Sequence, residues 1–196
     1  IEKNVFLSSK IQSFSIPSKV KELKEGWCND VSKLNSISIS PQNKHFKYID
    51  DKFLLGKSDE KSDIFDVLLF VRRDIEHVLI PSFVKKIGPF AFSNCMSLKS
   101  VKFENDSQLV SIGEFAFNNS TLESIFIPSS VCQIGEMAFA CCSCLQKIDN
   151  FENIQIRSIE KETFTWSALK SISIPSKVDE LKDRWCFGTT KLVHCS

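Results

Sequence analysis

Eight cysteines give this chain its widest chemical repertoire, because a thiolate can bind a metal, form a disulfide or act as a nucleophile. The densest group is Cys141-Cys142-Ser143-Cys144, which contains one Cys-x-x-Cys pair. Zinc sites need four ligands, usually from two such pairs, and a redox pair would be expected in a thioredoxin-like context. Neither a second pair nor that context is present. We therefore favour structural thiols over a disulfide, and a disulfide over a metal, and we expect no cofactor.

Histidine chemistry has little support either. The histidines are His45, His77 and His194, and a hydrolase would need one beside a nucleophile and a carboxylate. The sequence has no Gly-x-Ser-x-Gly elbow, no phosphate loop and no dinucleotide fingerprint. We expect His77 to be a solvated residue on an outward strand position. The sequence therefore predicts no catalytic residues and no enzyme.

Three N-glycosylation sequons begin at Asn105, Asn118 and Asn119, and the last two overlap. They matter only in a secreted protein. Asparagine and serine also fill polar turns, and we favour that simpler explanation.

Composition excludes several partners. The 196 residues carry a net charge of +1, with both signs interspersed, so no basic stripe offers itself to nucleic acid. No apolar run approaches the roughly 18 residues of a membrane span, so we expect no membrane insertion. The chain starts without Met and stops within a repeat. We therefore expect 1–196 to be a single repeat domain cut from a longer array.

The chain repeats itself on two scales. Ile1-Glu2-Lys3 returns at Ile159, and Trp27-Cys28 returns at Trp185, each offset by 158 residues. Within that period the phrase Leu-x-x-Ile-x-Ile-Pro, with variants, recurs at steps of 23, 24 and once 41 residues; it starts at Ile11, Leu34, Ile75, Leu98, Leu122, Leu145, Leu169 and Leu192. Periods of this size indicate a solenoid.

Each repeat predicts one coil of that solenoid. Alternation such as Ser100-Val101-Lys102-Phe103 is typical of a strand, and Pro81, Pro128 or Pro175 ends it. We expect the following glycines, Gly88, Gly113 and Gly135, to turn the chain at positive φ. The Ala-Phe pairs after them predict short helical turns on the convex side. We expect a column of stacked rings, formed by Phe6, Phe92, Phe117, Phe139 and Phe164.

Some coils depart from this form. Cysteine replaces the column phenylalanine at Cys28 and Cys186, where the adjacent tryptophan would fill the lost volume. Like Cys95 and Cys142, these cysteines are expected to be buried packing residues. The 41-residue step predicts a variant coil over 40–74 with a β-hairpin insert, whose strands are Lys52–Leu55 and Asp66–Phe70 and whose polar tip, Lys57–Asp63, is mobile or functional.

The segment from Leu122 to Phe139, Leu-x-x-Ile-x-Ile-Pro followed by Val-x-x-Ile-Gly and Ala-Phe, resembles a BspA-type leucine-rich repeat. The Arg73-Asp74-Ile75 coil start and the Trp-Cys variants resemble the expanded sets of such proteins in protozoan parasites. The resemblance implies a right-handed leucine-rich-repeat solenoid with a parallel concave sheet and short convex strands or turns. It also implies a cell-surface protein that binds host or other cell-surface proteins. An intracellular scaffold for a partner protein is the alternative.

Outward strand positions predict the binding surface. They form two columns in which the terminal coils carry serine and the middle coils carry His77, Leu79, Lys102, Phe126, Lys147 and Asp149. Exposed apolar residues flanked by charges are typical of an interface centre with a polar rim. The alternative is that Leu79 and Phe126 only cover each other across the sheet. The interrupted coils at Ile1 and Ser196 predict fraying or end-to-end self-association.

Overall fold

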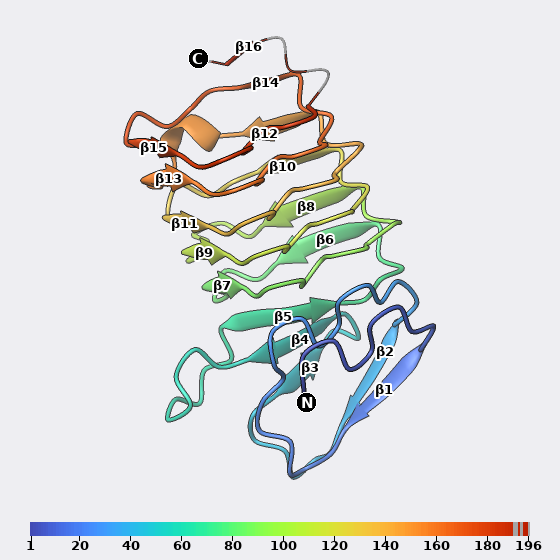
Figure 1. The fold of residues 1–196 in the computed structure, drawn as a ribbon. Coiled ribbons are helices and arrows are strands. Elements are labelled where there is room, and N and C mark those ends of the chain that lie inside the picture. Colours follow the sequence, from blue (N-terminus) through green and yellow to red (C-terminus); the bar gives the residue numbers. More distant parts are fainter. Residues whose placement is uncertain (190–191, 193, 196) are drawn as a thin grey trace.

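The computed structural model is a right-handed solenoid of about seven turns, built almost entirely of short strands and turns (Figure 1). The structure describes residues 1–189, 192 and 194–195. The expected leucine-rich-repeat architecture is confirmed, with one strand per coil on the concave side. The concave strands are β1 (Ser13–Ile16), β2 (Ser36–Ile39), β6 (His77–Ile80), β8 (Ser100–Phe103), β10 (Ser124–Phe126), β12 (Lys147–Asp149), β14 (Ser171–Ile172) and β16 (His194–Cys195).

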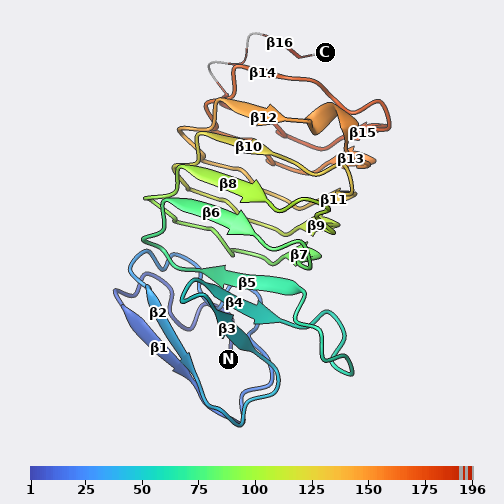
Figure 2. The same cartoon turned by 180° about the vertical axis from the view of Figure 1, so that it is seen from behind.

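The concave strands are parallel but do not form one sheet. β6, β8, β10 and β12 make a four-stranded sheet, whereas β1 pairs only with β2 and β14 only with β16. The β1–β2 pair is turned away from the central sheet in both views (Figures 1 and 2). A continuous concave sheet, as expected from the repeats, is therefore wrong at the N-terminal side, where the insert interrupts the stack.

A second sheet lies on the other side of the coils. Its strands are β3 (Lys47–Ile49), β4 (Phe53–Gly56), β5 (Val67–Val71), β7 (Lys86–Ile87), β9 (Ser111–Ile112) and β11 (Gln133–Ile134). β13 (Ser158–Ile159) and β15 (Glu180–Leu181) form a separate pair, and the one helix among the described residues is the 3₁₀ turn η1 (Phe151–Asn153). The predicted short strands on this side are thus confirmed.

A ladder of phenylalanine rings runs through the stack. Phe92, Phe117, Phe139 and Phe164 are fully buried. Successive ring centroids are 4.6, 5.1 and 5.7 Å apart, and the stacked rings are nearly parallel. Phe117 and Phe139 are each covered by rings of both neighbouring coils, as the Ala-Phe repeat predicted. Phe6 is not in this ladder, because it packs with Trp27 in the N-terminal core instead.

The predicted helical turns are wrong. Each convex segment contains two residues in the left-handed region, four positions apart, such as Phe90 (φ 59) with Asn94 (φ 58). Such residues break a helix. Main-chain bonds between coils, including Phe92 N–H to Ala116 O at 2.7 Å, hold this geometry. Bonding to the next coil therefore overrides local helix propensity.

The expectation of positive φ at Gly88, Gly113 and Gly135 is also wrong; among the described glycines only Gly26 and Gly188 have it. These positions instead require the absence of a side chain. A Cβ at Gly135 would lie 2.6 Å from the main-chain nitrogen of Glu114 on the preceding coil. Glycine here permits close approach between coils.

The insert extends the second sheet. β4 and β5 lie where the sequence predicted two strands, and they pair antiparallel. β3 pairs with β4 through a three-residue turn, 50–52, in which Asp50 and Asp51 have positive φ. β5 then pairs in parallel with β7. The loop between β4 and β5 projects from the side of the solenoid (Figures 1 and 2). Asp66 closes its base by accepting hydrogen bonds from the main chain and hydroxyl of Ser58.

Arg73 joins the coils on either side of the insert. It is 2% exposed, and its guanidinium lies 4.4 Å from the Phe70 ring centroid. It donates hydrogen bonds to the carbonyl oxygens of Val31 at 3.0 Å, Ala91 at 2.8 Å and Phe90 at 3.2 Å. Buried carbonyls without partners are costly, so these contacts stabilise the junction.

In the regular coils, a main-chain N–H group of the next coil donates to the equivalent carbonyl group. Cys95 occupies the same place in its coil as Val31, and its carbonyl accepts the N–H of Thr121 from the next coil at 3.3 Å. The insert displaces that donor beside Val31. Arg73 supplies a side-chain donor in its place.

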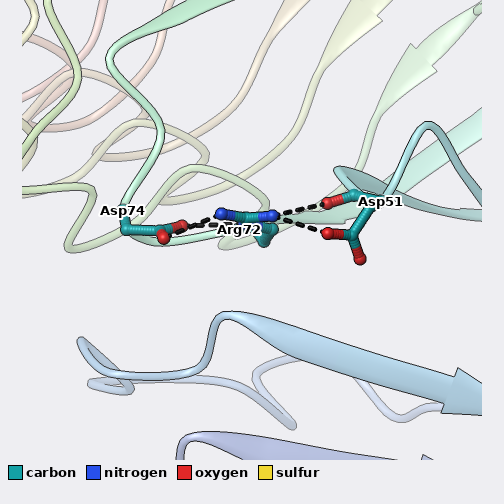
Figure 3. A network of polar contacts seen from close by, with 3 residues as sticks. All are labelled: Asp51, Arg72 and Asp74. Atoms are coloured by element: carbon teal, nitrogen blue, oxygen red, sulfur yellow. Dashed lines mark hydrogen bonds and ion pairs between the residues drawn. The ribbon is translucent and has the colours of Figure 1, made fainter.

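Arg72, the neighbouring residue, lies on the surface and makes a different set of contacts (Figure 3). Its guanidinium binds both carboxylate oxygens of Asp74 at 2.9 Å and one of Asp51 at 2.7 Å. These hydrogen bonds raise the pKa of Arg72 and lower that of Asp74. Because the Asp74 pKa is lowered on folding, the stabilisation is present at neutral pH and is lost as the pH falls through that lowered pKa.

The ring ladder gives a first prediction. Phe117→Ala removes a fully buried ring between two others and is expected to lower the free energy of unfolding by about 3–5 kcal/mol. Urea denaturation measures this change. Phe83→Ala, at a side chain 41% exposed, is the control and should change stability by no more than about 0.5 kcal/mol. Equal effects of the two substitutions would contradict the ladder.

The close approach of neighbouring coils at glycine gives a second prediction. Gly135→Ala places a methyl group against fixed main-chain atoms and is expected to destabilise the protein by about 1–3 kcal/mol. Gly56→Ala is the matched control, because its Cβ would meet only side-chain atoms of Leu69, Cδ1 at 2.7 Å, Cγ at 3.3 Å and Cδ2 at 3.7 Å, and a side chain can shift where main-chain atoms cannot. Thermal denaturation of both variants should separate them; a harmless Gly135→Ala would refute this role.

Arg72 and Arg73 give a third prediction. Arg73→Met leaves the Val31 carbonyl oxygen without a donor, and it removes one of the donors of the Ala91 and Phe90 carbonyl oxygens, which keep main-chain donors. The substitution should cost about 2–3 kcal/mol, the upper part of the range of about 1–3 kcal/mol for one unsatisfied buried group. Arg72→Met removes partly exposed ion pairs and should cost only about 1 kcal/mol, less in high salt. Chemical denaturation at low and high salt distinguishes them. A larger loss from Arg72→Met would reverse this assignment.

Candidate protein-binding surface

The six residues predicted to form the binding surface lie on the four-stranded central sheet. Their side chains point outward at alternate strand positions, while the intervening residues, such as Val78 and Ile125, are buried. In register, His77 lies opposite Ser100 and Leu79 opposite Lys102 on β8. Ser124 lies opposite Lys147, and Phe126 opposite Asp149, on β10 and β12. The coils thus bring these residues onto one surface.

Leu79 and Phe126 are the apolar part of this surface. Leu79 is 53% exposed and Phe126 is 52% exposed. They lie on β6 and β10, with β8 and Lys102 between them. Strands are about 4.8 Å apart, so the two side chains belong to strands about 10 Å apart. They do not cover each other, and that alternative is wrong.

Polar groups surround the apolar pair. A ring nitrogen of His77 lies 2.9 Å from the Ser100 hydroxyl. Lys147 forms an ion pair with Asp149, and this hydrogen bond raises the pKa of Lys147. These contacts are exposed, so each contributes little to stability. They orient charged groups at the rim of the surface.

A hollow beside Phe126 was not expected from the sequence. It has a volume of about 340 Å³ and lies beyond the ends of β8 and β10. Its lining is apolar at Phe103, Phe126 and Pro128, and polar along the turn 104–107 and at Ser129 and Ser130. The one hint in the sequence was a bulky residue, Phe103, at an inward strand position. In the structure this side chain is half-buried. The hollow adjoins the predicted surface at Phe126.

The serine columns of the terminal coils lie outside this surface. Ser13 and Ser15 lie opposite Ser36 and Ser38, as the repeat predicted. Because β1 and β2 form their own sheet, these serines do not continue the central columns. The surface available without interruption is therefore that of β6, β8, β10 and β12.

No other chemistry-bearing group of side chains comes together. In the described chain, no three His, Cys, Asp or Glu side chains could hold one metal ion. His45 lies in a groove beside Phe46, Lys57 and Glu60 of the insert, whereas His77 is on the concave sheet. The side chain of His194 lies outside the described part of the structure. No helix of the described residues is long and apolar enough to cross a membrane.

Six cysteines are free thiols: Cys28, Cys95, Cys132, Cys141, Cys142 and Cys144. Cys28, Cys95 and Cys142 are fully buried, as predicted, whereas the prediction that Cys186 is buried is wrong, because it is only partly buried. Burial raises the pKa of Cys28 to about 11 and that of Cys142 to about 12. These thiols stay protonated at neutral pH, which disfavours nucleophilic or metal chemistry.

Cys28 and Cys95 also contribute to the junction at the insert. Their sulfur atoms accept hydrogen bonds from the Arg73 guanidinium at 3.6 and 3.4 Å. In the Cys141–Cys144 cluster, only Cys142 is buried, and it donates to the carbonyl oxygen of Phe117 at 3.1 Å. The arrangement is that of packing residues.

Comparison with known proteins agrees with this geometry. The model of the BspA type leucine rich repeat region matches residues 1–59 and 65–193, in six copies. The chain belongs to the BspA-type leucine-rich repeat family. None of the curated proteins matches it.

Solved bacterial structures share the fold. A leucine-rich repeat protein from Eubacterium ventriosum is 22% identical, with a TM-score of 0.83, over 96% of this chain and 49% of that one. A leucine rich cell surface protein from Faecalibacterium prausnitzii is 23% identical, with a TM-score of 0.65, over 98% and 43%. This BspA-type chain therefore spans less than half the length of either protein.

Proposed function

We propose that this BspA-type chain is a protein-binding module displayed at a cell surface, and that its partner docks on the central concave sheet. The observation that carries the proposal is the exposed pair Leu79 and Phe126, each more than half exposed on a rigid parallel sheet and bordered by charged side chains. Such a patch is typical of an interface centre within a polar rim. Solenoids commonly present such concave surfaces to proteins.

Similarity to a solved bacterial structure supports the proposal of surface display. The similar protein from Faecalibacterium prausnitzii is described as a leucine rich cell surface protein. A host cell-surface or extracellular-matrix protein is the partner class that we favour. The similarity to parasite proteins stays a prediction, as does end-to-end self-association through exposed residues of the terminal coils such as Leu7 and Leu181.

The second candidate function is an intracellular scaffold that uses the same sheet. The free thiols favour it, because disulfides are common in extracellular proteins. Titration of the thiols in denatured protein from its natural source discriminates the two: oxidised cysteines favour display, whereas fully reduced ones favour the scaffold. Neither function requires a catalytic residue.

The test is a Leu79→Ser, Phe126→Ser double substitution. Because both side chains are exposed, folding should be retained, with a change in stability of no more than about 1 kcal/mol. Binding to surface proteins of host cells or of the producing cell should fall at least about tenfold, as expected when central apolar contacts are lost. Pull-down followed by titration of the captured partner measures this.

The matched control is Met96→Ser with Val110→Ser, two exposed apolar residues outside the concave strands. It should leave binding unchanged. A double variant of the concave sheet that folds and binds normally would place the site elsewhere. The loop Lys57–Asp63, which projects from the insert, would then be the next surface to substitute.

A further inference from the structure

The three sequons of this chain differ in whether the side-chain nitrogen of their Asn is available for modification. The side-chain nitrogen of Asn118 donates to the carbonyl oxygen of Ala140 on the next coil at 3.2 Å. That of Asn119 donates to the side chain of Asn94 on the preceding coil at 2.6 Å. Both nitrogens point at neighbouring coils, and both residues are half-buried. A sugar on either nitrogen would collide with the stack.

Asn105 differs from both. It is exposed and opens the turn after β8, in which Asp106 is left-handed at φ 59. Among the described residues, no hydrogen bond engages its side chain, so its nitrogen is free to carry a substituent. The two other requirements of a sequon, a residue other than proline and then a hydroxyl, are met by Asp106 and Ser107.

The hollow of about 340 Å³ adjoins this residue, since Asn105 is one of its lining residues. Phe103, two positions earlier, and Phe126 and Pro128 from the next coil give it an apolar wall. Ser129 and the turn residues give it polar groups. N-acetylglucosamine has an apolar ring face and a methyl group beside hydroxyls and an amide, so its chemistry matches this mixed lining.

We propose that Asn105 is an N-glycosylation site and that the first N-acetylglucosamine occupies the hollow formed by Phe103, Phe126 and Pro128. The donor is an oligosaccharide linked to a lipid through pyrophosphate. The side-chain nitrogen of Asn105 forms a bond to C1 of the sugar, the bond from C1 to the pyrophosphate oxygen breaks, and the lipid pyrophosphate leaves. The nitrogen loses one proton to a base. The proposal rests on the proposed surface display, because the modification needs a secretory compartment.

The glycan would define one border of the binding surface. Phe126 belongs to both the hollow and the concave patch, whereas Leu79 lies two strands away. A partner would therefore approach from the side of His77 and Leu79, and the sugar would shield the opposite edge of Phe126.

The first test is site occupancy. The chain is secreted from a eukaryotic cell that performs N-glycosylation, and peptides are analysed by mass spectrometry after enzymatic release of glycans in heavy-oxygen water. We expect most molecules to be modified at Asn105 and few at Asn118 or Asn119. Asn105→Gln should abolish the mass shift, while Asn118→Gln should not. Secreted chain that is bare at Asn105, or modified mainly at Asn118 or Asn119, overturns the proposal.

The second test concerns the hollow. Trimming the glycan to its first sugar should leave the melting temperature unchanged, and complete removal should lower it by about 2–4 °C, the shift expected for one modest contact in a chain of this size. Asn105→Gln treated in parallel should show no change. Equal melting temperatures of trimmed and bare protein would show that the sugar does not occupy the hollow. Neither test measures partner binding, so failure here leaves the proposed function standing.

Discussion

A coil of this chain cannot bury its own apolar side, and this constraint shapes the whole molecule. The phenylalanines of the ladder are covered largely by rings of neighbouring coils: Phe117 lies between Phe92 and Phe139, and Phe139 lies between Phe117 and Phe164. Stacking at that distance forces the main chains together, which leaves no room for a Cβ at Gly113 or Gly135. The same approach lets main-chain groups bond between coils, and those bonds hold bulky residues such as Phe115 and Met137 at positive φ. The unfavourable local conformation is thus a consequence of favourable burial and bonding elsewhere.

The insert breaks this scheme and has to be accommodated. It adds antiparallel strands to the second sheet and separates the coil before it from the coil after it on the concave side. The carbonyl group of Val31 at the break has no main-chain donor, and burial would make an unsatisfied carbonyl costly. Arg73 resolves the problem because a guanidinium has five donors in a fixed plane and can reach both flanking coils. The buried charge has three carbonyls, two thiols and the Phe70 ring as partners, and Arg72 has the nearby carboxylates.

Much of this could be predicted from the sequence, because the signals are periodic. Repeated strand alternation and repeated Ala-Phe pairs specify the solenoid, its concave strands and the ring ladder. The errors concern interactions between distant segments. Nothing local distinguishes a glycine needed for positive φ from one needed for close approach, and nothing local shows that Phe90 forms a left-handed turn. Arg73 stood out in the sequence only as part of a coil start, since its partners Val31 and Ala91 are 42 and 18 residues away. The hollow at Phe103 was missed because two coils and a turn create it together.

The same division explains why the binding surface can vary while the fold stays constant. Inward strand positions pack between neighbouring coils, so they are Val, Ile or Phe. Outward positions contact only their strand neighbours, so serine, histidine, lysine, leucine or phenylalanine fits equally well there. Function in such an array is therefore carried by side chains that contribute least to stability. The insert limits how far that surface extends, because the separate β1–β2 pair ends the central sheet on one side. The proposed partner surface thus lies where stacking is uninterrupted, and its proposed specificity would come from the residues that stacking leaves free.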